Sequence, residues 1–225
     1  MTGMLASVTN VEEALLVLQA QVDIIDLKQP ALGALGALDN ATVKHIVQAI
    51  AGHCPVSATI GDLPMQPELV FNAVSAMAAT GVDYVKIGFF PEGDSLATVA
   101  KLAALTGQHA LIAVLFADCQ PEFELIGVLK QAGFKGVMLD TMDKKRGSLL
   151  QVMGKTTIAE FVSQAKARQL LCGLAGSLRL DDIATLLPYQ PDYLGFRGAL
   201  CAQHKRTGQL SGAAIGQIKH AITNG

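Results

Sequence analysis

The chain has 225 residues, of which 51% are hydrophobic and 16% are charged, and its formal net charge is only -2. This balance gives no basic surplus for binding nucleic acid and no acidic tail typical of a disordered arm. No uninterrupted apolar run approaches the roughly 18 residues that a membrane-spanning helix needs. The first residues, Met1 to Leu5, lack the basic region and the long apolar stretch of a secretory signal. We therefore expect a cytoplasmic protein with neither a nucleic-acid nor a membrane partner.

The cysteines and histidines show no pattern typical of a metal site. Cys54, Cys119, Cys172 and Cys201 are widely spaced and include no CxxC pair, which favours reduced cysteines over a disulfide framework or a zinc site. The five histidines have no metal-ligand spacing. We therefore expect no catalytic metal and no cofactor.

Short β-rich runs alternate with longer helical patterns from one end of the chain to the other. The expected strands are 4–8, 23–28, 56–61, 84–89, 109–117, 136–141, 171–176 and 193–198. The first expected helix is marked by the helical spacing of Val11, Ala14, Leu15 and Leu18. Further helices are expected at about 40–51, 67–80, 95–106, 121–132, 157–168, 180–187 and 209–222.

This alternation predicts the fold class. Eight strands, each followed by a helix, is the count of a closed parallel barrel. A doubly wound open sheet is the main alternative, because it has the same β-α alternation and the same continuous apolar strands. The strand count and the chain length favour a single (β/α)8 TIM barrel over residues 1–225. No linker rich in proline, serine or charge marks a domain boundary.

Two lysines, Lys28 and Lys86, lie in or at the end of these apolar strands. A lysine is almost never fully buried without a partner, and a desolvated lysine loses its proton readily. Inward residues of a barrel come in layers from alternate strands, so Lys28, Lys86 and Asp140 should meet over one cavity. Asp26 shares a strand face with Lys28.

These four groups point to carbonyl chemistry. Two neighbouring lysines depress each other's pKa, which makes an amine nucleophilic enough to form a Schiff base. Asp26 and Asp140 would then orient the amines, relay protons or bind substrate hydroxyls. The alternative is a structural ion-pair network that closes the top of the barrel.

The last two expected strands end in glycine-rich segments. Loops after the seventh and eighth strands commonly form the phosphate site of a barrel. Gly176 and Gly198 let the backbone approach an anion, Ser177 adds a hydroxyl, and Arg197 offers a planar fork for phosphate or carboxylate. Glycine and serine are also ordinary loop residues, so the position after these strands carries the prediction.

Other polar residues are weaker candidates. Ser57 and Thr59 alternate on the third strand and are predicted to line the pocket. Asp62 follows that strand and Asp118 ends the fifth, where each is either a site residue or a turn or capping residue.

A basic cluster, Lys144-Lys145-Arg146, follows the sixth strand. Such clusters are usually solvated, but this one is placed to hold a second phosphate, for which we select Lys145. Lys155 follows in the same connection and is the other candidate. The length of the connection, from 141 to 156, permits a mobile lid.

Six segments carry a resemblance to a known family, and they span nearly the whole chain. They are DIIDLKQPALGALGA (23–37), VSATIGDLP (56–64), DYVKIGF (83–89), MLDT (138–141), LLCGLAGSL (170–178) and GFRGALC (195–201). Together they resemble the (5-formylfuran-3-yl)methyl phosphate synthases, the furan-forming enzymes of methanofuran and methylofuran biosynthesis.

The resemblance implies a (β/α)8 barrel and a phosphate-eliminating carbon-oxygen lyase of one-carbon metabolism. It implies that two molecules of the triose phosphate glyceraldehyde 3-phosphate condense into one furan phosphate. The Schiff-base lysine of the family falls on Lys28, its proton-transferring lysine on Lys86, and its strand-end acids on Asp26 and Asp140. The connection after the sixth strand varies within the family, so the resemblance gives no role to Lys145 or Lys155.

Two other functions stay open at this point. Another class I aldolase acting on phosphorylated sugars would use the same lysines without making a furan. A non-catalytic barrel would bind phosphorylated metabolites or a partner protein. Scattered apolar surface also leaves open a homo-oligomer, with no interface identified.

Overall fold

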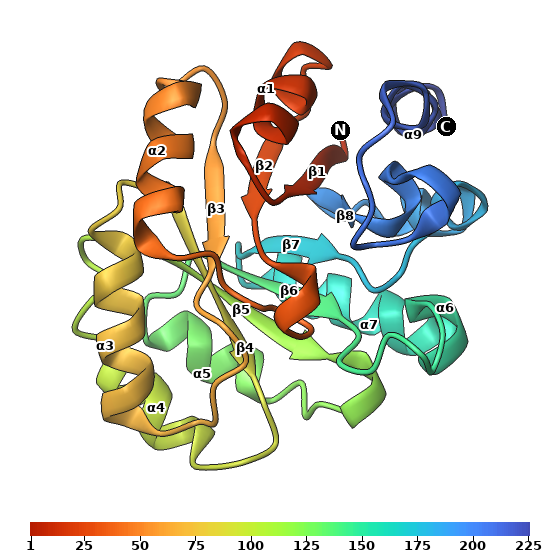
Figure 1. Cartoon of the computed structure of the whole chain (residues 1–225). Coiled ribbons are helices and arrows are strands. Elements are labelled where there is room, and N and C mark those ends of the chain that lie inside the picture. Colours follow the sequence, from red (N-terminus) through yellow and green to blue (C-terminus); the bar gives the residue numbers. More distant parts are fainter.

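Eight parallel strands close into a barrel in the computed structural model of the chain, which describes residues 1–225 (Figure 1). Neighbouring strands pair in sequence order, and β1 pairs with β8 to complete the ring. This closure confirms the (β/α)8 prediction over an open sheet. The strands are β1 (Gly3–Val8), β2 (Ile24–Leu27), β3 (Val56–Thr59), β4 (Tyr84–Phe89), β5 (Ala110–Phe116), β6 (Gly136–Asp140), β7 (Leu171–Leu174) and β8 (Tyr193–Phe196).

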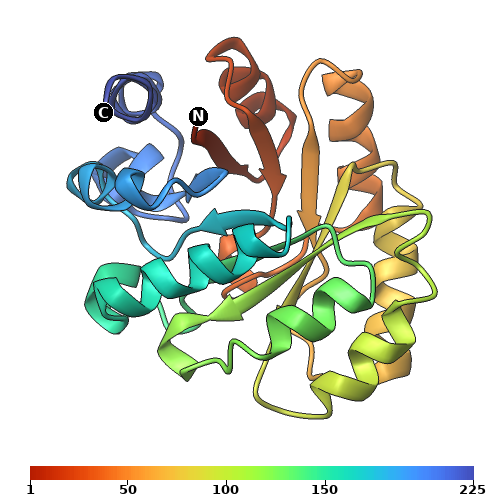
Figure 2. The ribbon, with the colours of Figure 1, turned by 180° about the vertical axis from the view of Figure 1, so that it is seen from behind.

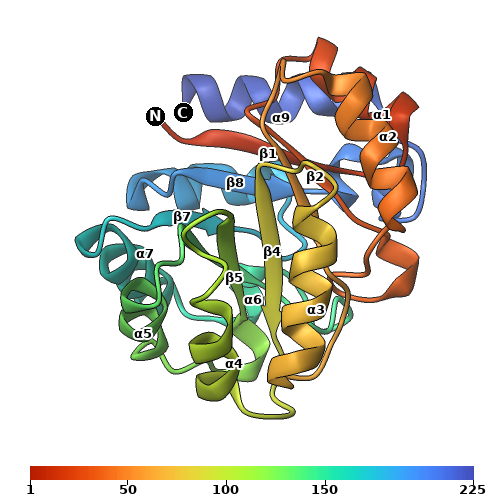
Figure 3. The same ribbon diagram turned by 90° about the vertical axis from the view of Figure 1, so that its left-hand side faces the viewer.

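Helices surround the barrel and cover the outer face of the strands (Figures 1 and 2). They are α1 (Val11–Gln19), α2 (Asn40–Ile50), α3 (Pro67–Ala78), α4 (Ser95–Leu102), α5 (Leu125–Gln131), α6 (Leu149–Val152), α7 (Lys155–Ala167), α8 (Ile183–Leu186) and α9 (Gly212–Asn224). The last helix, α9, lies beside β1 and α1, which brings the two chain ends close together (Figure 3). None of these helices combines the length and the apolar character that crossing a bilayer would require.

Helix α2 shows how the sequence forms these elements. Its buried residues are Val43, Ile46 and Ile50, a three- and four-residue spacing that places them on one face against the strands. The helix begins after Asp39, whose carboxylate accepts the backbone N–H of Thr42 at 2.9 Å. Such a cap satisfies an N–H that has no partner within the helix. The local sequence therefore fixes both the start of the helix and the face that it buries.

The apolar core has two layers. A cluster of 54 buried residues fills the space between the strands and the helices, and a separate cluster of 10 lies inside the barrel. The inner cluster includes Tyr193, whose ring lies against Gly173. A Cβ on Gly173 would lie only 2.3 Å from that ring, so the glycine makes room for the tyrosine. The inner cluster thus fills the barrel and also includes Ala34, Leu35, Phe90 and Ala175 from the loops that follow the strands.

Several predicted boundaries differ from the structure. The seventh strand stops at Leu174 because Gly176 (φ 110°) and Ser177 (φ 51°) have left-handed backbone conformations, which a strand cannot include. The expected helix at 180–187 is helical in the structure, but only α8 (Ile183–Leu186) is α-helical, with 3-10 turns at Leu180–Asp182 and Leu187–Tyr189 on either side. The prediction of one long connection from 141 to 156 was wrong, because α6 and the start of α7 lie within it.

Candidate active site

A cavity of about 170 Å³ opens where the strands end. Its wall includes side chains from β1, β4, β6 and β8 and from the loops that follow β2, β6, β7 and β8. The structure brings Lys28, Lys86 and Asp140 together on this wall, as the alternation of strands predicted. The cavity is rich in cationic side chains, which are Lys28, Lys86, Lys144, Arg179, Arg197 and Arg206.

Asp26 and Lys86 form a buried ion pair beneath the cavity. The Lys86 ammonium donates to Oδ1 of Asp26 at 3.0 Å, and both side chains are at most 2% exposed. The hydroxyls of Ser57 and Ser7 also donate to this carboxylate, at 2.7 and 2.9 Å. Burial acts to raise the pKa of Asp26, but the ammonium groups of Lys86 and Lys28 and the Ser57 hydrogen bond together hold it below its ordinary value. Asp26 is therefore an anion that holds Lys86 in place.

Lys28 is the cavity lysine whose side-chain amine makes neither a hydrogen bond nor an ion pair. It follows β2 directly, is 7% exposed, and lines the cavity. Burial is the largest influence on its pKa, and together with the ammonium groups of Lys144 and Lys86 it outweighs the carboxylates of Asp140 and Asp26. The pKa of Lys28 is thereby lowered from 10.5 to about 8. A substantial fraction of Lys28 is consequently neutral near physiological pH, and a neutral amine is the nucleophilic form.

Asp140 is paired with Lys144, which lies four residues further along the chain. The Lys144 ammonium contacts both Oδ1 of Asp140 and the carbonyl oxygen of Thr141. The Thr141 backbone N–H donates to the same carboxylate oxygen at 2.7 Å. Burial acts to raise the pKa of Asp140, but the ammonium groups of Lys144 and Lys28 prevail and lower it to about 2. Asp140 is therefore a fixed negative charge near neutral pH rather than a proton donor.

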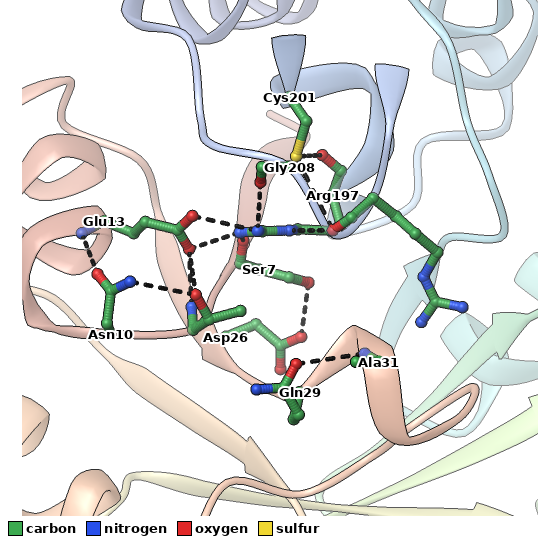
Figure 4. Close-up of polar contacts among 11 residues, drawn as sticks. Ser7, Asn10, Glu13, Asp26, Gln29, Ala31, Arg197, Cys201 and Gly208 are labelled. Atoms are coloured by element: carbon green, nitrogen blue, oxygen red, sulfur yellow. Dashed lines mark hydrogen bonds and ion pairs between the residues drawn. The ribbon is translucent and has the colours of Figure 1, made fainter. Parts of the chain in front are cut away.

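Arg197 does not present the free guanidinium that the sequence analysis expected. Its Nη atoms pair with both carboxylate oxygens of Glu13, at 2.6 and 3.1 Å (Figure 4). The remaining N–H groups donate to the carbonyl oxygens of Ser7, Arg206 and Gly208 at 2.8 to 3.1 Å. A guanidinium has five N–H donors, and all five are used. This corrects the prediction that Arg197 offers a free guanidinium to phosphate. Its side chain instead holds α1, β1 and the loop after β8 together.

Comparison with known sequences identifies the family. The sequence model of the family described as 4-HFC-P synthase matches residues 4–219. The chain belongs to this family. The match confirms the resemblance carried by the six sequence segments.

Individual members of the 4-HFC-P synthase family are similar over nearly the whole chain. A protein of Methylorubrum extorquens, provisionally named (5-formylfuran-3-yl)methyl phosphate synthase, is 40% identical over 222 residues, 99% of this chain and 92% of the relative. The (5-formylfuran-3-yl)methyl phosphate synthase of Methanosarcina acetivorans is 30% identical over 216 residues, 91% of this chain and 92% of the relative. Among solved structures, phosphoribosyl anthranilate isomerase from Thermotoga maritima has a TM-score of 0.72 over 100% of both chains. At 13% identity, that likeness shows the fold alone.

The glycine-rich segments of this 4-HFC-P synthase family member do reach the cavity. Gly176, Ser177 and Gly198 all line it. A Cβ on Gly176 would lie 2.9 Å from Cγ2 of Thr141, so a side chain there would push the loop out of place. Ser177 has a φ of 51°, a conformation that is costly for a residue other than glycine and is concentrated at functional sites.

Four other predicted residues lie away from this cavity wall. Ser57 points at Asp26, and the Thr59 hydroxyl donates to the carbonyl oxygen of Gly36 at 3.1 Å. Lys145 and Lys155 are exposed outside the cavity. Lys155 is the first residue of α7. The lysine of the basic cluster that does line the cavity is Lys144.

Asp62 and Asp118 hold loops rather than line the cavity. The Asp62 carboxylate accepts the backbone N–H groups of Ala34 and Leu35, at 2.8 and 2.7 Å. Asp118 accepts the backbone N–H groups that follow β6, at 2.7 and 2.8 Å. Each aspartate thus joins its own loop to a neighbouring loop at the barrel mouth.

The sequence analysis missed Arg206. This residue lies in the loop after β8, lines the cavity, and donates from Nη2 to the carbonyl oxygen of Gly33 at 2.8 Å. No local pattern marks it, because its partner is 173 residues away in the chain. Elsewhere, no group of three or more His, Cys, Asp or Glu side chains is placed to hold a metal ion.

Proposed function

We propose that this chain condenses two molecules of glyceraldehyde 3-phosphate into (5-formylfuran-3-yl)methyl phosphate through a Schiff base on Lys28. One observation carries the proposal: Lys28 is an unpaired amine facing the cavity, and its pKa is lowered to about 8. The names of the relatives support the product. The cavity chemistry supports the route. The protein would then be a phosphate-eliminating lyase, and we propose that it acts in the cytoplasm.

The first half of the proposed reaction activates one triose phosphate. The neutral Lys28 amine adds to the aldehyde carbon, and loss of water gives an iminium ion. The positive iminium nitrogen withdraws electrons, so the neighbouring carbon releases its proton and an enamine forms. Lys86, held by Asp26, is placed to exchange protons at this stage, while Asp140 remains ionised and stabilises positive charge.

The second half joins the carbon skeletons. The enamine expels inorganic phosphate from C3 of the bound triose, which leaves an enol whose C3 is nucleophilic. This carbon attacks C2 of the second triose phosphate after a proton shift has converted it into its ketone isomer. The C1 hydroxyl of that ketone closes the ring on C2 of the first triose, loss of two water molecules gives the furan, and hydrolysis of the imine releases Lys28. We assign one substrate phosphate to the segment Gly176–Ser177, where backbone N–H groups and the Ser177 hydroxyl serve as donors.

Borohydride trapping tests the proposed chemistry directly. Incubation with glyceraldehyde 3-phosphate and borohydride should reduce the imine to a stable amine, and peptide mapping should place the adduct on Lys28. In parallel, furan absorbance should increase together with released phosphate. Trapping without a furan chromophore would instead favour another class I aldolase. Absence of both an adduct and turnover would favour a non-catalytic phosphometabolite-binding barrel.

A Lys86→Gln variant separates the two lysines. Because Lys86 is assigned to proton exchange, this variant should still form the trapped adduct on Lys28 while furan formation falls by about 10²-fold or more. Peptide mapping of the trapped variant provides the measurement. An adduct that is lost in Lys86→Gln, or that maps to Lys86 in the unaltered protein, would reverse the two assignments.

The pH dependence should report the Lys28 amine. A protonated amine has no lone pair to attack a carbonyl, so only the neutral fraction reacts. With the pKa at about 8, kcat/KM should rise about tenfold per pH unit below that pH and level off above it. An ordinary lysine would continue the rise to a pH near its usual pKa of about 10.5. Rates measured from about pH 6 to about pH 9.5 distinguish the two profiles.

A further inference from the structure

The cationic groups of the cavity fall into two sets. Three are neutralised by carboxylates: Lys86 by Asp26, Lys144 by Asp140 and Arg197 by Glu13. The other three, Lys28, Arg179 and Arg206, belong to none of the four salt bridges in the structure. Lys28 is assigned to the Schiff base, and Arg179 is exposed at the rim. Arg206 is therefore the half-buried cation that the proposed chemistry has not used.

The loop after β8 places the Arg206 side chain across the cavity mouth. The backbone carbonyl of Arg206 accepts Nε of Arg197 at 2.8 Å, which fixes the base of the side chain. Its Cβ lies 3.9 Å from the position that a Cβ on Gly198 would occupy, so the side chain starts beside the end of β8. Its tip reaches Gly33 in the loop after β2, a loop that Asp62 holds in place.

The Arg206 guanidinium has unused donors. Only Nη2 has a hydrogen-bond partner, the Gly33 carbonyl oxygen, so Nε and Nη1 are without one. Burial lowers the pKa of Arg206 from its ordinary value, and the carboxylates of Asp140 and Asp62 counteract this without forming an ion pair. A partly desolvated guanidinium without a carboxylate partner is costly until an anion binds it. The planar fork matches the oxygens of a phosphate monoester.

We propose that Arg206 is the main ligand of a second anion subsite, which binds the phosphate monoester of one of the two triose phosphates. This inference rests on the proposed function, which requires two phosphates in one cavity. The subsite lies on the side of the mouth formed by the loops after β8 and β2. The Gly176–Ser177 segment belongs instead to the loop after β7 and lies against Thr141 and Leu149. Two substrate molecules would thus be held by their phosphates at separate positions around Lys28.

Inorganic phosphate provides a binding test that needs no turnover. Calorimetric titration of the unaltered protein should show two phosphate-binding events. Arg206→Gln should weaken one of them at least tenfold and leave the other within twofold. Arg206→Lys should give an intermediate loss, because lysine keeps the charge without the fork. The matched control is Lys205→Gln, which removes an exposed cation from the same loop and should bind phosphate like the unaltered protein. Two unchanged affinities in Arg206→Gln would overturn the proposal.

Trapping distinguishes substrate binding from support of the loop. Arg206→Gln should raise the KM for glyceraldehyde 3-phosphate at least tenfold, whereas trapping of Lys28 by unphosphorylated glyceraldehyde should stay within twofold. An equal loss for both aldehydes would show that Arg206 only positions the loops. If Arg206→Gln fails to fold, Arg206→Lys must show the same preference for a KM effect, and its absence would also overturn the proposal. One outcome is that the unaltered protein makes no furan while the Arg206→Gln variant loses one phosphate site. In that case the anion subsite stands and the proposed function fails.

Discussion

Replacement of Lys28 by alanine is expected to reduce furan formation by at least about 10³-fold, as expected when an enzyme loses its covalent nucleophile. The amine is the proposed site of imine formation, and no other cavity lysine is free, because Lys86 and Lys144 are paired with carboxylates. The fold should not suffer. Lys28 makes no ion pair, and its removal takes a desolvated cation out of the structure. The circular dichroism spectrum should therefore match that of the unaltered protein. The midpoint of urea unfolding should be equal to or higher than that of the unaltered protein.

Two further variants make the Lys28 result specific. Lys28→Arg keeps a positive charge but removes the amine, so it should be as inactive as Lys28→Ala if imine formation is the role of the residue. Lys44→Ala removes an exposed lysine from α2 and should retain activity within twofold. Activity in Lys28→Arg close to that of the unaltered protein would show that the charge of Lys28 matters rather than its nucleophilicity.

Replacement of Arg197 by methionine is expected to lower the free energy of unfolding by about 3–5 kcal/mol. The Arg197 and Glu13 side chains are only 6% and 12% exposed, so the substitution leaves a nearly buried carboxylate without its cation. It also leaves the carbonyl oxygens of Ser7, Arg206 and Gly208 without their donor. Urea unfolding followed by circular dichroism would measure the loss.

A double-mutant cycle tests the cause of that loss. Because removal of both members of a buried pair leaves no uncompensated charge, Glu13→Leu combined with Arg197→Met should cost clearly less than the sum of the single variants. Arg179→Met is the matched control, since its side chain is exposed and unpaired, and it should change stability by less than about 0.5 kcal/mol. A loss below about 1 kcal/mol in Arg197→Met would show that the ion pair does not hold these segments together.

The sequence was sufficient to predict the barrel and the central groups of the site. Strand alternation has a period of two, and barrel layers draw on alternate strands, so residues at strand ends can be placed without knowledge of distant contacts. This logic brought Lys28, Lys86 and Asp140 to one cavity, where the structure has them. It worked because strand geometry alone fixes their positions.

Loop residues could not be assigned in this way. Arg197 and Arg206 are nine residues apart, and their sequence neighbourhoods do not show which one is free to bind a ligand. The difference comes from Glu13, which is 184 residues from Arg197 in the chain and neutralises it. Similarly, the choice among Lys144, Lys145 and Lys155 depends on where α6 and α7 begin. Both assignments rest on tertiary contacts and loop conformation, which periodicity does not report.

The closure of the barrel has a consequence for the order of folding. The hydroxyl of Thr2 donates to the carbonyl oxygen of Pro191 at 2.8 Å, and Arg197 donates to that of Ser7 at 3.1 Å, across 189 and 190 residues. Contacts of such long sequence separation carry a high loop-closure entropy and tend to form slowly. During synthesis, the edge of β1 that pairs with β8 therefore stays unpaired until β8 has left the ribosome. Catalytic competence should therefore be among the last properties that the nascent chain acquires. The incomplete barrel, with its unpaired strand edges, should be the state most prone to aggregation.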